Sequence, residues 1–390
     1  MNETIEPFHL HISEPFHLHI SDALLADLRD RLARTRWPEK ETVPGREQGV
    51  PLAEAQALCT YWRDTYDWRR CEAMLNDVGQ YRTHIDGLGI HFLHVRSPHA
   101  DALPLILTHG WPGSVIEFHK VIGPLTDPTA HGGDAADAFH VVVPSLPGSG
   151  FSDRPEATGW TIDRIGQAWI TLMRRLGYAR FVAQGGDWGS GVTLAIGASG
   201  APEVAGIHLN MVFAQPNADD LANLSDREKQ ALADTKRYTS EGMGYAMQQS
   251  TRPQTLGYGL TDSPSGQAMW IYDKFAEWAD CEGDPHSVFT RDEMLDNIML
   301  YWLTGTAASS ARLYWESFRQ LGAREVSVPL GCSVFPGEIV RPSQAWAARK
   351  YPTLHYWGEP PRGGHFAAFE QPTLFVEEVR AAFRALRPDA

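Results

Sequence analysis

The sequence predicts an α/β fold in which a mostly parallel sheet carries helices on both faces. From residue 85 onward, short apolar runs, several of them β-branched, alternate with segments of helical length. These runs stop after residue 212 and return near residue 326, which indicates a helical insertion. A glycine-rich turn at residues 185–189 joins one run to a helical segment, an arrangement typical of a nucleophile elbow.

Composition restricts the classes of function. The 390 residues suffice for a large core with an insertion, and 43% hydrophobic with 21% charged residues is ordinary for a folded soluble protein. A net charge of -14 would repel phosphate backbones, so we expect no nucleic-acid partner. No CxxC pair is present, and we expect four buried thiols rather than a disulfide or zinc framework: Cys59, Cys71, Cys281 and Cys332.

The start of the chain carries no recognisable targeting signal. "MNETIEPFHLHIS" lacks a basic region followed by an apolar run, so no signal peptide is expected. No window approaches the ~20 apolar residues of a membrane-spanning helix. We therefore expect a cytoplasmic protein without a membrane anchor.

The octapeptide EPFHLHIS occurs twice in tandem, at residues 6–13 and 14–21. Its alternation of apolar residues with histidine has the period of a half-buried strand, which Pro15 would interrupt between the copies. No cysteine or close carboxylate pair completes a metal site with the histidines, so we interpret the repeat as a recent duplication or a cloning artefact. The histidines concerned are His9, His11, His17 and His19.

A helix is predicted next, with Ser21 as its N-cap and Pro38 as its end. Residues 1–80 are therefore expected to form a mostly helical arm that packs on a larger unit. The apolar face of the helix would consist of Leu24, Leu25, Leu28 and Leu32.

Strands and helices then alternate in an order that indicates a core with a cap. A helical insertion late in the strand order would lie over the C-terminal strand ends, where open α/β sheets bind ligands. Strands are predicted at residues 89–97, 104–110, 139–145, 180–186, 206–212, 326–336 and 353–359. The predicted units are the arm (1–80), a first core part (81–212), the cap (213–318) and a second core part (319–390).

The segment Gly185-Gly186-Asp187-Trp188-Gly189 fits the small-x-nucleophile-x-small pattern of the elbow, with Asp187 as the nucleophile. An elbow residue is strained, and helix and strand approach there too closely for larger side chains, which accounts for the glycines. On this motif alone, Asp187 fits equally well as the N-cap of the following helix.

A second turn, HGWPGS at residues 109–114, follows an earlier predicted strand and resembles an oxyanion-hole loop. In that arrangement the backbone N–H groups of Trp111 and Trp188 would surround a developing oxyanion. We interpret His109 as a structural turn residue rather than a catalytic base.

The segment RGGHFAAFEQP, residues 362–372, places His365 after the last predicted strand, where folds of this kind hold the general base. Glu338 is the carboxylate at the end of the preceding strand, and no acid directly follows the strand at 206–212. The order nucleophile, acid, histidine is that of an α/β-hydrolase. Asp187, Glu338 and His365 therefore form a candidate triad.

An aspartate nucleophile predicts displacement at sp³ carbon, which leaves an alkyl ester on the enzyme rather than an acyl-enzyme. His365, oriented by Glu338, would then activate water to attack the ester carbonyl, and the two amides would stabilise the oxyanion. Epoxides and haloalkanes both suit this chemistry, because an epoxide oxygen needs a proton on opening and a halide needs N–H donors.

Taken together, the motifs resemble the microsomal-type epoxide hydrolases of the α/β-hydrolase fold, including their N-terminal arm. The likeness covers nearly the whole chain and rests on ISDALLADLRDRLARTRWPE, HGWPGS, QGGDWGS, STRPQTLGYGLTDSP, MLYWLTGTAASSARLY, FPGE and RGGHFAAFEQP. The resemblance implies a carboxylate nucleophile, a His–Glu pair and two cap tyrosines. Tyr245 and Tyr314 match these tyrosines, whose hydroxyls would bind and protonate the epoxide oxygen, whereas Tyr301 is expected to be an ordinary core residue.

The resemblance also implies the partners: a small-molecule epoxide and water, with no cofactor and no metal. Membrane-bound animal members carry an N-terminal anchor that is not recognised here, so we expect a bacterial-type relative, for which a homodimer is one option. Tryptophans in the cap suggest an aromatic or bulky apolar epoxide: Trp270, Trp278, Trp302 and Trp315.

Two alternatives stay open at this point. A haloalkane dehalogenase shares the aspartate nucleophile, but the two tyrosines, the arm and tryptophan within HGxP speak against it. A catalytically silent binding protein on this fold would be expected to lack a triad member, and all three positions are filled.

Overall fold

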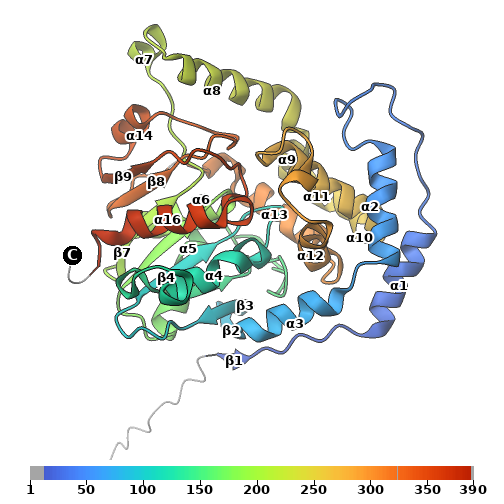
Figure 1. The fold of residues 1–390 in the computed structure, drawn as a ribbon, viewed down its shortest axis with the longest axis horizontal. Helices are drawn as coiled ribbons and strands as arrows, with labels where there is room; N and C mark the ends of the chain where they lie inside the picture. Colours follow the sequence, from blue (N-terminus) through green and yellow to red (C-terminus); the bar gives the residue numbers. More distant parts are fainter. Residues whose placement is uncertain (1–12, 323, 388–390) are drawn as a thin grey trace, which may run out of the picture.

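The computed structural model describes residues 13–322 and 324–387 (Figure 1). In this part of the chain a nine-stranded sheet forms the centre, with the strand order β1-β2-β3-β5-β4-β6-β7-β8-β9. Neighbours from β5 to β9 in this order are parallel, and β1, β2 and β3 join them as antiparallel strands. The predicted α/β-hydrolase fold with a mostly parallel sheet is confirmed.

The central strands are buried on both faces, as the apolar runs predict. Seven strands coincide with those runs. β2 was not predicted because Gln80–Ile85 contains polar residues at most positions, and β1 includes Pro15, where the sequence suggested an interruption. The strands are β1 (Glu14–Pro15), β2 (Gln80–Ile85), β3 (Leu88–Val95), β4 (Leu103–Thr108), β5 (Phe139–Pro144), β6 (Phe181–Gly185), β7 (Val204–Leu209), β8 (Leu330–Ser333) and β9 (Leu354–Gly358).

Helices cover both faces of the sheet. In Figure 1, α4 and α16 lie together in front of it, and α5 and α6 lie together behind it. The core helices are α4 (His119–Thr126), α5 (Ile162–Arg175), α6 (Trp188–Ala198), α14 (Gln344–Lys350), α15 (Ala367–Glu370) and α16 (Pro372–Arg384).

The chain between β7 and β8 is helical, as expected for the insertion. Figure 1 shows α9 to α13 gathered beside one end of the sheet, and α8 extending away from them above it. The division into arm, core and cap stays a prediction. The helices of this segment are α7 (Ala218–Ala222), α8 (Asp226–Arg237), α9 (Gly244–Thr251), α10 (Pro253–Asp262), α11 (Pro264–Trp278), α12 (Arg291–Trp302) and α13 (Ala307–Ser317).

The first helix, α1 (Asp22–Ala33), begins where the sequence predicts, with Ser21 Oγ accepting a hydrogen bond from the Leu24 amide. Leu24 itself is 49% exposed, so its assignment to the apolar face is wrong. Pro38 does not end the helix either. The helix closes earlier, where Thr35 Oγ1 donates to a carbonyl of the last turn. The buried face consists of Leu25, Leu28 and Leu32.

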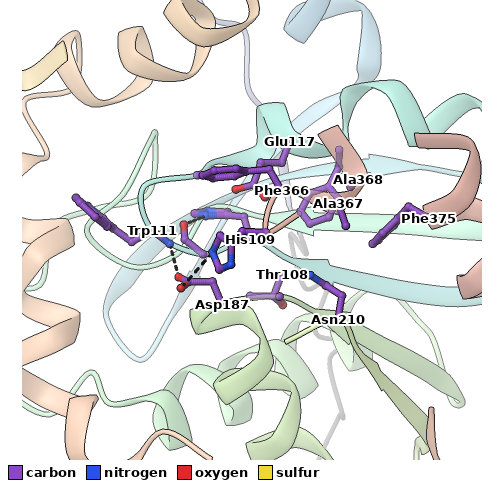
Figure 2. A pocket seen from close by; sticks show the side chains of 15 residues that line it. Thr108, His109, Trp111, Glu117, Asp187, Asn210, Phe366, Ala367, Ala368 and Phe375 are labelled. Carbon is purple, nitrogen blue, oxygen red and sulfur yellow. Dashed lines mark hydrogen bonds and ion pairs between the residues drawn. The ribbon is translucent and has the colours of Figure 1, made fainter. Parts of the chain in front are cut away.

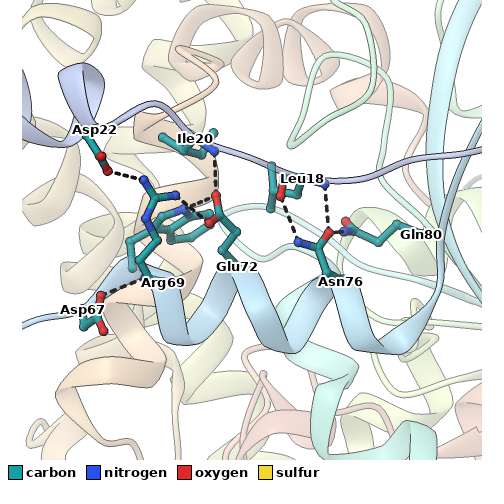
Figure 3. Close-up of polar contacts among 9 residues, drawn as sticks. Leu18, Ile20, Asp22, Asp67, Arg69, Glu72, Asn76 and Gln80 are labelled. Carbon is teal, nitrogen blue, oxygen red and sulfur yellow. Dashed lines mark hydrogen bonds and ion pairs between the residues drawn. The ribbon is translucent and has the colours of Figure 1, made fainter.

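The segment before α1 lies along α3 (Trp68–Val78) rather than in a long strand (Figure 3). Leu18 N donates to Asn76 Oδ1 at 2.8 Å, and Asn76 Nδ2 donates to Leu18 O at 2.9 Å. Ile20 N donates to Glu72 Oε1 at 2.6 Å. Side chains of α3 thus satisfy backbone groups that a partner strand would otherwise satisfy.

The predicted alternation in the second octapeptide is present, but the strand lies elsewhere. Leu18 is buried between the exposed His17 and His19. Pro15 does not interrupt a strand, because it belongs to β1 at the sheet edge, where a missing N–H is tolerated. His9 and His11 lie outside the described residues.

The arm is fastened to α12. Tyr66 OH donates to Asp296 Oδ1 at 2.7 Å, and Arg70 forms an ion pair with Asp296 Oδ2 at 2.5 Å. Tyr61 OH donates to Asp292 Oδ1 at 2.7 Å. Besides α1 and α3, the arm contains α2 (Leu52–Asp64), and Figure 1 shows α1 and α2 beside α10 and α11.

Two predictions about the whole chain can be compared with the described residues. Among these residues, no helix combines the length and apolar character that crossing a bilayer requires. The prediction of buried free thiols is confirmed for all four cysteines: Cys59, Cys71, Cys281 and Cys332.

Asn76→Ala should destabilise the arm, because it removes both hydrogen bonds to Leu18 and leaves two backbone groups unpaired. We expect a loss on the order of 1–3 kcal/mol, measured as a lower midpoint of urea unfolding. Asn223→Ala, at the exposed end of α7, is the control and should leave the midpoint unchanged. Equal midpoints for the two variants would show that the contacts with α3 contribute little.

Candidate active site

Asp187 lies at the tip of the turn between β6 and α6, with φ 50° and ψ -126°. A positive φ is strained for aspartate and is typical of an elbow. A Cβ on Gly185 would lie 2.2 Å from Gly189 O, and one on Gly189 would lie 1.9 Å from Thr108 O, so both positions require glycine. The Asp187 side chain makes no capping hydrogen bond to α6, so capping does not explain an aspartate here.

The loop after β4 brings a backbone donor to this carboxylate. Trp111 N donates to Asp187 Oδ1 at 2.7 Å (Figure 2). Trp188, the first residue of α6, follows Asp187 directly, so its amide lies at the helix N-terminus, where N–H groups lack intrahelical partners. The structure therefore shows the Trp111 amide bound to Asp187, and the role of the Trp188 amide stays a prediction.

Helix α12 holds the loop from the other side. Asn297 Nδ2 donates to Pro112 O at 2.8 Å, and Tyr301 OH donates to Gly113 O at 2.6 Å. The expectation that Tyr301 is an ordinary core residue is therefore too simple, because its hydroxyl positions the loop that carries Trp111.

His109 is a structural residue, as predicted. Its Nδ1 lies 2.8 Å from Gly110 O, and its Nε2 accepts a hydrogen bond from Leu146 N at 3.2 Å. Burial lowers the pKa of His109 to about 4, so it stays neutral and holds two loops together.

His365 lies between the two acidic candidates. Its Nδ1 is 2.7 Å from Glu338 Oε1, and its Nε2 is 3.5 Å from Asp187 Oδ2. All three side chains are buried. Glu338 lies beyond the end of β8, and a β-bridge between Gly337 and Gly364 brings its loop to that of His365. The structure thus brings the three candidate residues together from three separate loops.

The protonation state of His365 follows from its neighbours. Burial by itself would lower the pKa of His365, but the charge of Glu338 and the hydrogen bonds and charge of Asp187 and Glu338 raise it well above its usual 6.5. The raised pKa favours the imidazolium form of His365 in the resting site, in which Nδ1 faces Glu338 and Nε2 faces Asp187. In this state it cannot accept a proton.

Glu370 fixes the loop of His365 and was not singled out from the sequence. It lies in the same motif, five positions after the histidine, but a glutamate there has no distinctive spacing. Burial raises the pKa of Glu370 to about 7, and the amides that it accepts act in the opposite direction. These amides belong to Asp280, Gly364 and Phe366.

The two predicted tyrosines reach the site from α9 and α13. The Tyr245 ring stacks on Trp111 with centroids 5.1 Å apart, and the Tyr314 ring meets Trp111 edge-on at 5.7 Å. Burial is the main reason that both phenol pKa values are raised, and the charge of Asp187 adds to it. The buried Tyr314 hydroxyl has no hydrogen-bond partner among the described residues, so it is free to bind a ligand oxygen.

Tyr245 has two neighbours that the sequence did not reveal. Its hydroxyl lies 2.9 Å from the hydroxyl of Tyr238, two helical turns earlier in a π-helical segment. The Lys274 ammonium lies 5.0 Å from the centroid of the Tyr245 ring, within range of a cation–π interaction. In the sequence, the only indication of Tyr238 was its position seven residues before Tyr245, which places both on the same side of a helix.

The four cap tryptophans do not form one cluster at the site. Trp278 meets Trp111 and His365, but Trp315 is 53% exposed. Trp302 lies beneath Arg31 of the arm, and Trp270 bonds to Gln249. Helical spacing alone could not separate the one tryptophan at the site from the others.

Within the described residues, no group of three or more histidine, cysteine or acidic side chains is arranged to hold a metal ion. The groups that meet at the site are the carboxylates of Asp187 and Glu338, the imidazole ring of His365, backbone amides and the phenols of two tyrosines.

Comparisons with known proteins agree on one family. The family model described as "Epoxide hydrolase N terminus" matches residues 13–118, and that of the α/β hydrolase fold matches residues 104–254. A "Putative epoxide hydrolase" of Stigmatella aurantiaca (strain DW4/3-1) is 59% identical, over 93% of this chain and 83% of that protein. Epoxide hydrolase 1 of Sus scrofa is 36% identical, over 97% and 88% of the two chains. The structure of Aspergillus niger epoxide hydrolase matches with a TM-score of 0.86 and 30% identity, covering 96% of both chains.

His365 should be doubly protonated at neutral pH, because Glu338 and Asp187 both stabilise its charge. We expect ¹⁵N NMR to show an imidazolium signal that disappears in His365→Gln. Glu338→Gln should lower the pKa of His365, because it removes one of the two charges. A neutral imidazole in the unmodified protein would contradict this electrostatic account.

Proposed function

Because the chain belongs to the epoxide hydrolase family and hydrolyses epoxides, we propose that it does so through a covalent ester on Asp187. The observation that carries this proposal is the position of the Asp187 carboxylate. One of its oxygens accepts from the Trp111 amide, and the other lies 3.5 Å from His365 Nε2. A carboxylate held in this way is ready to attack, while the histidine is not yet a base.

In the first step, an Asp187 oxygen attacks a ring carbon of the epoxide, and the bond from that carbon to the ring oxygen breaks. The electron pair stays on the ring oxygen, which takes a proton from one of the phenols of Tyr245 and Tyr314. Both hydroxyls are buried, where a donor stabilises developing negative charge more strongly than in water. The product is a hydroxyalkyl ester of Asp187.

Ester formation changes the charge beside His365. Asp187 becomes neutral, so one of the two charges that raise the pKa of His365 is lost. The pKa of His365 then falls, and its Nε2 proton passes, directly or through water, to the phenolate left by the first step. This transfer restores the tyrosine and leaves a neutral imidazole. Glu338 stays in place and keeps the Nδ1 proton. The base therefore forms after the ester, which separates the two half-reactions in time.

In the second step, His365 takes a proton from water, and the hydroxide attacks the carbonyl carbon of the Asp187 ester. The amides of Trp111 and Trp188 stabilise the oxyanion of the tetrahedral intermediate. Collapse of this intermediate breaks the acyl C–O bond, and the departing alkoxide takes the proton of the added hydroxyl. The Asp187 carboxylate and the His365 imidazolium are thereby restored, and a vicinal diol is released. No residue other than Asp187 is covalently changed during the cycle.

We also propose an apolar, aromatic or bulky substrate, because the rings of Trp111, Trp188 and Trp278 surround the site. In this proposal α9 and α13, which carry Tyr245 and Tyr314, form part of a lid that covers the site on the side of the inserted helices. A cytoplasmic location and a homodimer remain predictions from the sequence.

His365→Gln should still form the ester but should not hydrolyse it, since glutamine cannot serve as the base. After mixing with styrene oxide, intact-mass analysis should find the protein heavier by one substrate. His131→Gln, at an exposed position, is the matched control and should turn over normally. A folded His365→Gln protein that binds substrate and never gains its mass would count against the ester.

Tyr245→Phe and Tyr314→Phe should each slow alkylation by styrene oxide, because each removes a donor to the opening oxygen. Losing one donor in a dry site costs on the order of 2–4 kcal/mol, roughly 10²–10³ in rate. The double variant should be nearly inactive, and Tyr258→Phe, with the residue 72% exposed, is the control. Unchanged alkylation in both single variants, together with bromide release from bromohexane, would favour a dehalogenase-like use of the site.

A further inference from the structure

A small cavity borders Asp187 and His365 on the side of the core (Figure 2). Its described lining residues come from the ends of β4, β6 and β7, from the turn at residues 115–118, and from residues 365–375. None of them belongs to α7–α13, so the cavity is distinct from the side on which Tyr245 and Tyr314 lie.

Polar and apolar groups divide the cavity wall. Phe118, Phe366 and Phe375 form much of its apolar part. Besides the catalytic pair, the carboxyl of Glu117 and the amide of Asn210 face it. A cavity holds water when it offers two to four polar partners, and this one offers that number.

The half-buried Glu117 side chain lines this cavity and forms no ion pair with the described residues. Within the part of the chain that the structure describes, no side chain donates a hydrogen bond to its carboxyl, and the backbone amide of Ser114 acts on it and lowers its pKa. Burial raises the pKa of Glu117 to about 8, the charge of Asp187 adds to this effect and that of His365 opposes it. The carboxyl is therefore mostly protonated at neutral pH and close enough to both catalytic groups to feel their charges.

Glu117 also contacts the oxyanion loop. A Cβ on Gly113 would lie 1.3 Å from Glu117 Oε1, so the carboxyl rests directly on the backbone of this glycine. The loop that positions Trp111 thus fixes Glu117 too. Glu117 is therefore fixed relative to the Trp111 amide, which in the proposed mechanism polarises the carbonyl of the Asp187 ester.

The hydrolytic step requires a water held in one orientation. Its first hydrogen must point at His365 Nε2, and its second needs an acceptor so that a lone pair faces the carbonyl carbon. Asn210 is a poor acceptor, because its Oδ1 already accepts from Gln184 Nε2 at 2.8 Å. The carbonyl oxygen of a neutral Glu117 carboxyl is free for this role.

We propose that this cavity is the site of the hydrolytic water and that Glu117 is a positioning residue that accepts the second hydrogen bond of that water. The inference rests on the proposed ester of Asp187. Glu117 transfers no proton in this scheme: water gives its proton to His365, and its oxygen forms the bond to the ester carbon.

The test compares Glu117→Leu, which removes the acceptor, with Glu117→Gln, which keeps a carbonyl oxygen at the same reach. Single-turnover reactions with styrene oxide, quenched and weighed as intact protein, give alkylation and ester hydrolysis separately. For Glu117→Leu we expect alkylation within about threefold of the unchanged protein and hydrolysis roughly 10–100-fold slower, with accumulated ester. Glu117→Gln should hydrolyse the ester about tenfold faster than Glu117→Leu, because it retains the acceptor.

Controls separate the possible failures. Glu377→Leu, on the exposed face of α16, should leave both rates unchanged. A Glu117→Leu protein that loses both half-reactions equally, or hydrolyses ester at the normal rate, would overturn the role of Glu117. The same holds if Glu117→Gln hydrolyses as slowly as Glu117→Leu. If His365→Gln forms no ester, the covalent route fails and this inference falls with it; ester in His365→Gln but none in Glu117→Leu overturns the role of Glu117 alone.

Discussion

One imidazolium held between two buried carboxylates is the interaction on which the site depends. Burying Asp187 and Glu338 without a cation would cost several kcal/mol for each charge, and the proton on His365 offsets this cost. In the mechanism that we propose, the same contact withholds the base until Asp187 is alkylated. In that mechanism, neutralising one carboxylate releases the histidine, so the passage from nucleophilic attack to hydrolysis requires no conformational change.

The geometry of this contact is maintained by segments far apart in the sequence. Helix α12 is central, because Asn297 and Tyr301 hold the oxyanion loop while Asp296 binds the arm through Tyr66 and Arg70. On the other side, Glu370 ties the loop of His365 to the end of α11. The N-terminal segment therefore contacts α12, and the inserted helices hold the loops that carry Trp111 and His365.

Local patterns were enough to predict the sheet, the helical insertion and the residues that the structure gathers around Asp187. The elbow glycines, for example, are required because backbone atoms approach closely within a short segment. Such a local requirement can be recognised from the sequence motif alone. Glu370 and Glu117 were missed because their importance comes from their surroundings in the folded chain, which the spacing of residues along the sequence does not reveal. Leu24 was misassigned, and the tryptophan at the site could not be singled out, because helical period identifies a face but not what covers it. Pro38 was misjudged because a proline limits how far a helix can extend, and this helix closes earlier, at Thr35.

The central claim is that water attacks the enzyme's own ester rather than the epoxide, and isotope labelling tests it most directly. With enzyme in excess of substrate in H₂¹⁸O, one turnover should place the label in the Asp187 side chain, detectable in the peptide that contains it. The first diol molecules should carry only unlabelled oxygen, because their new oxygen comes from the carboxylate. Label in the first diol, with an unlabelled Asp187 peptide, would contradict the covalent route and would indicate direct attack of water on the epoxide.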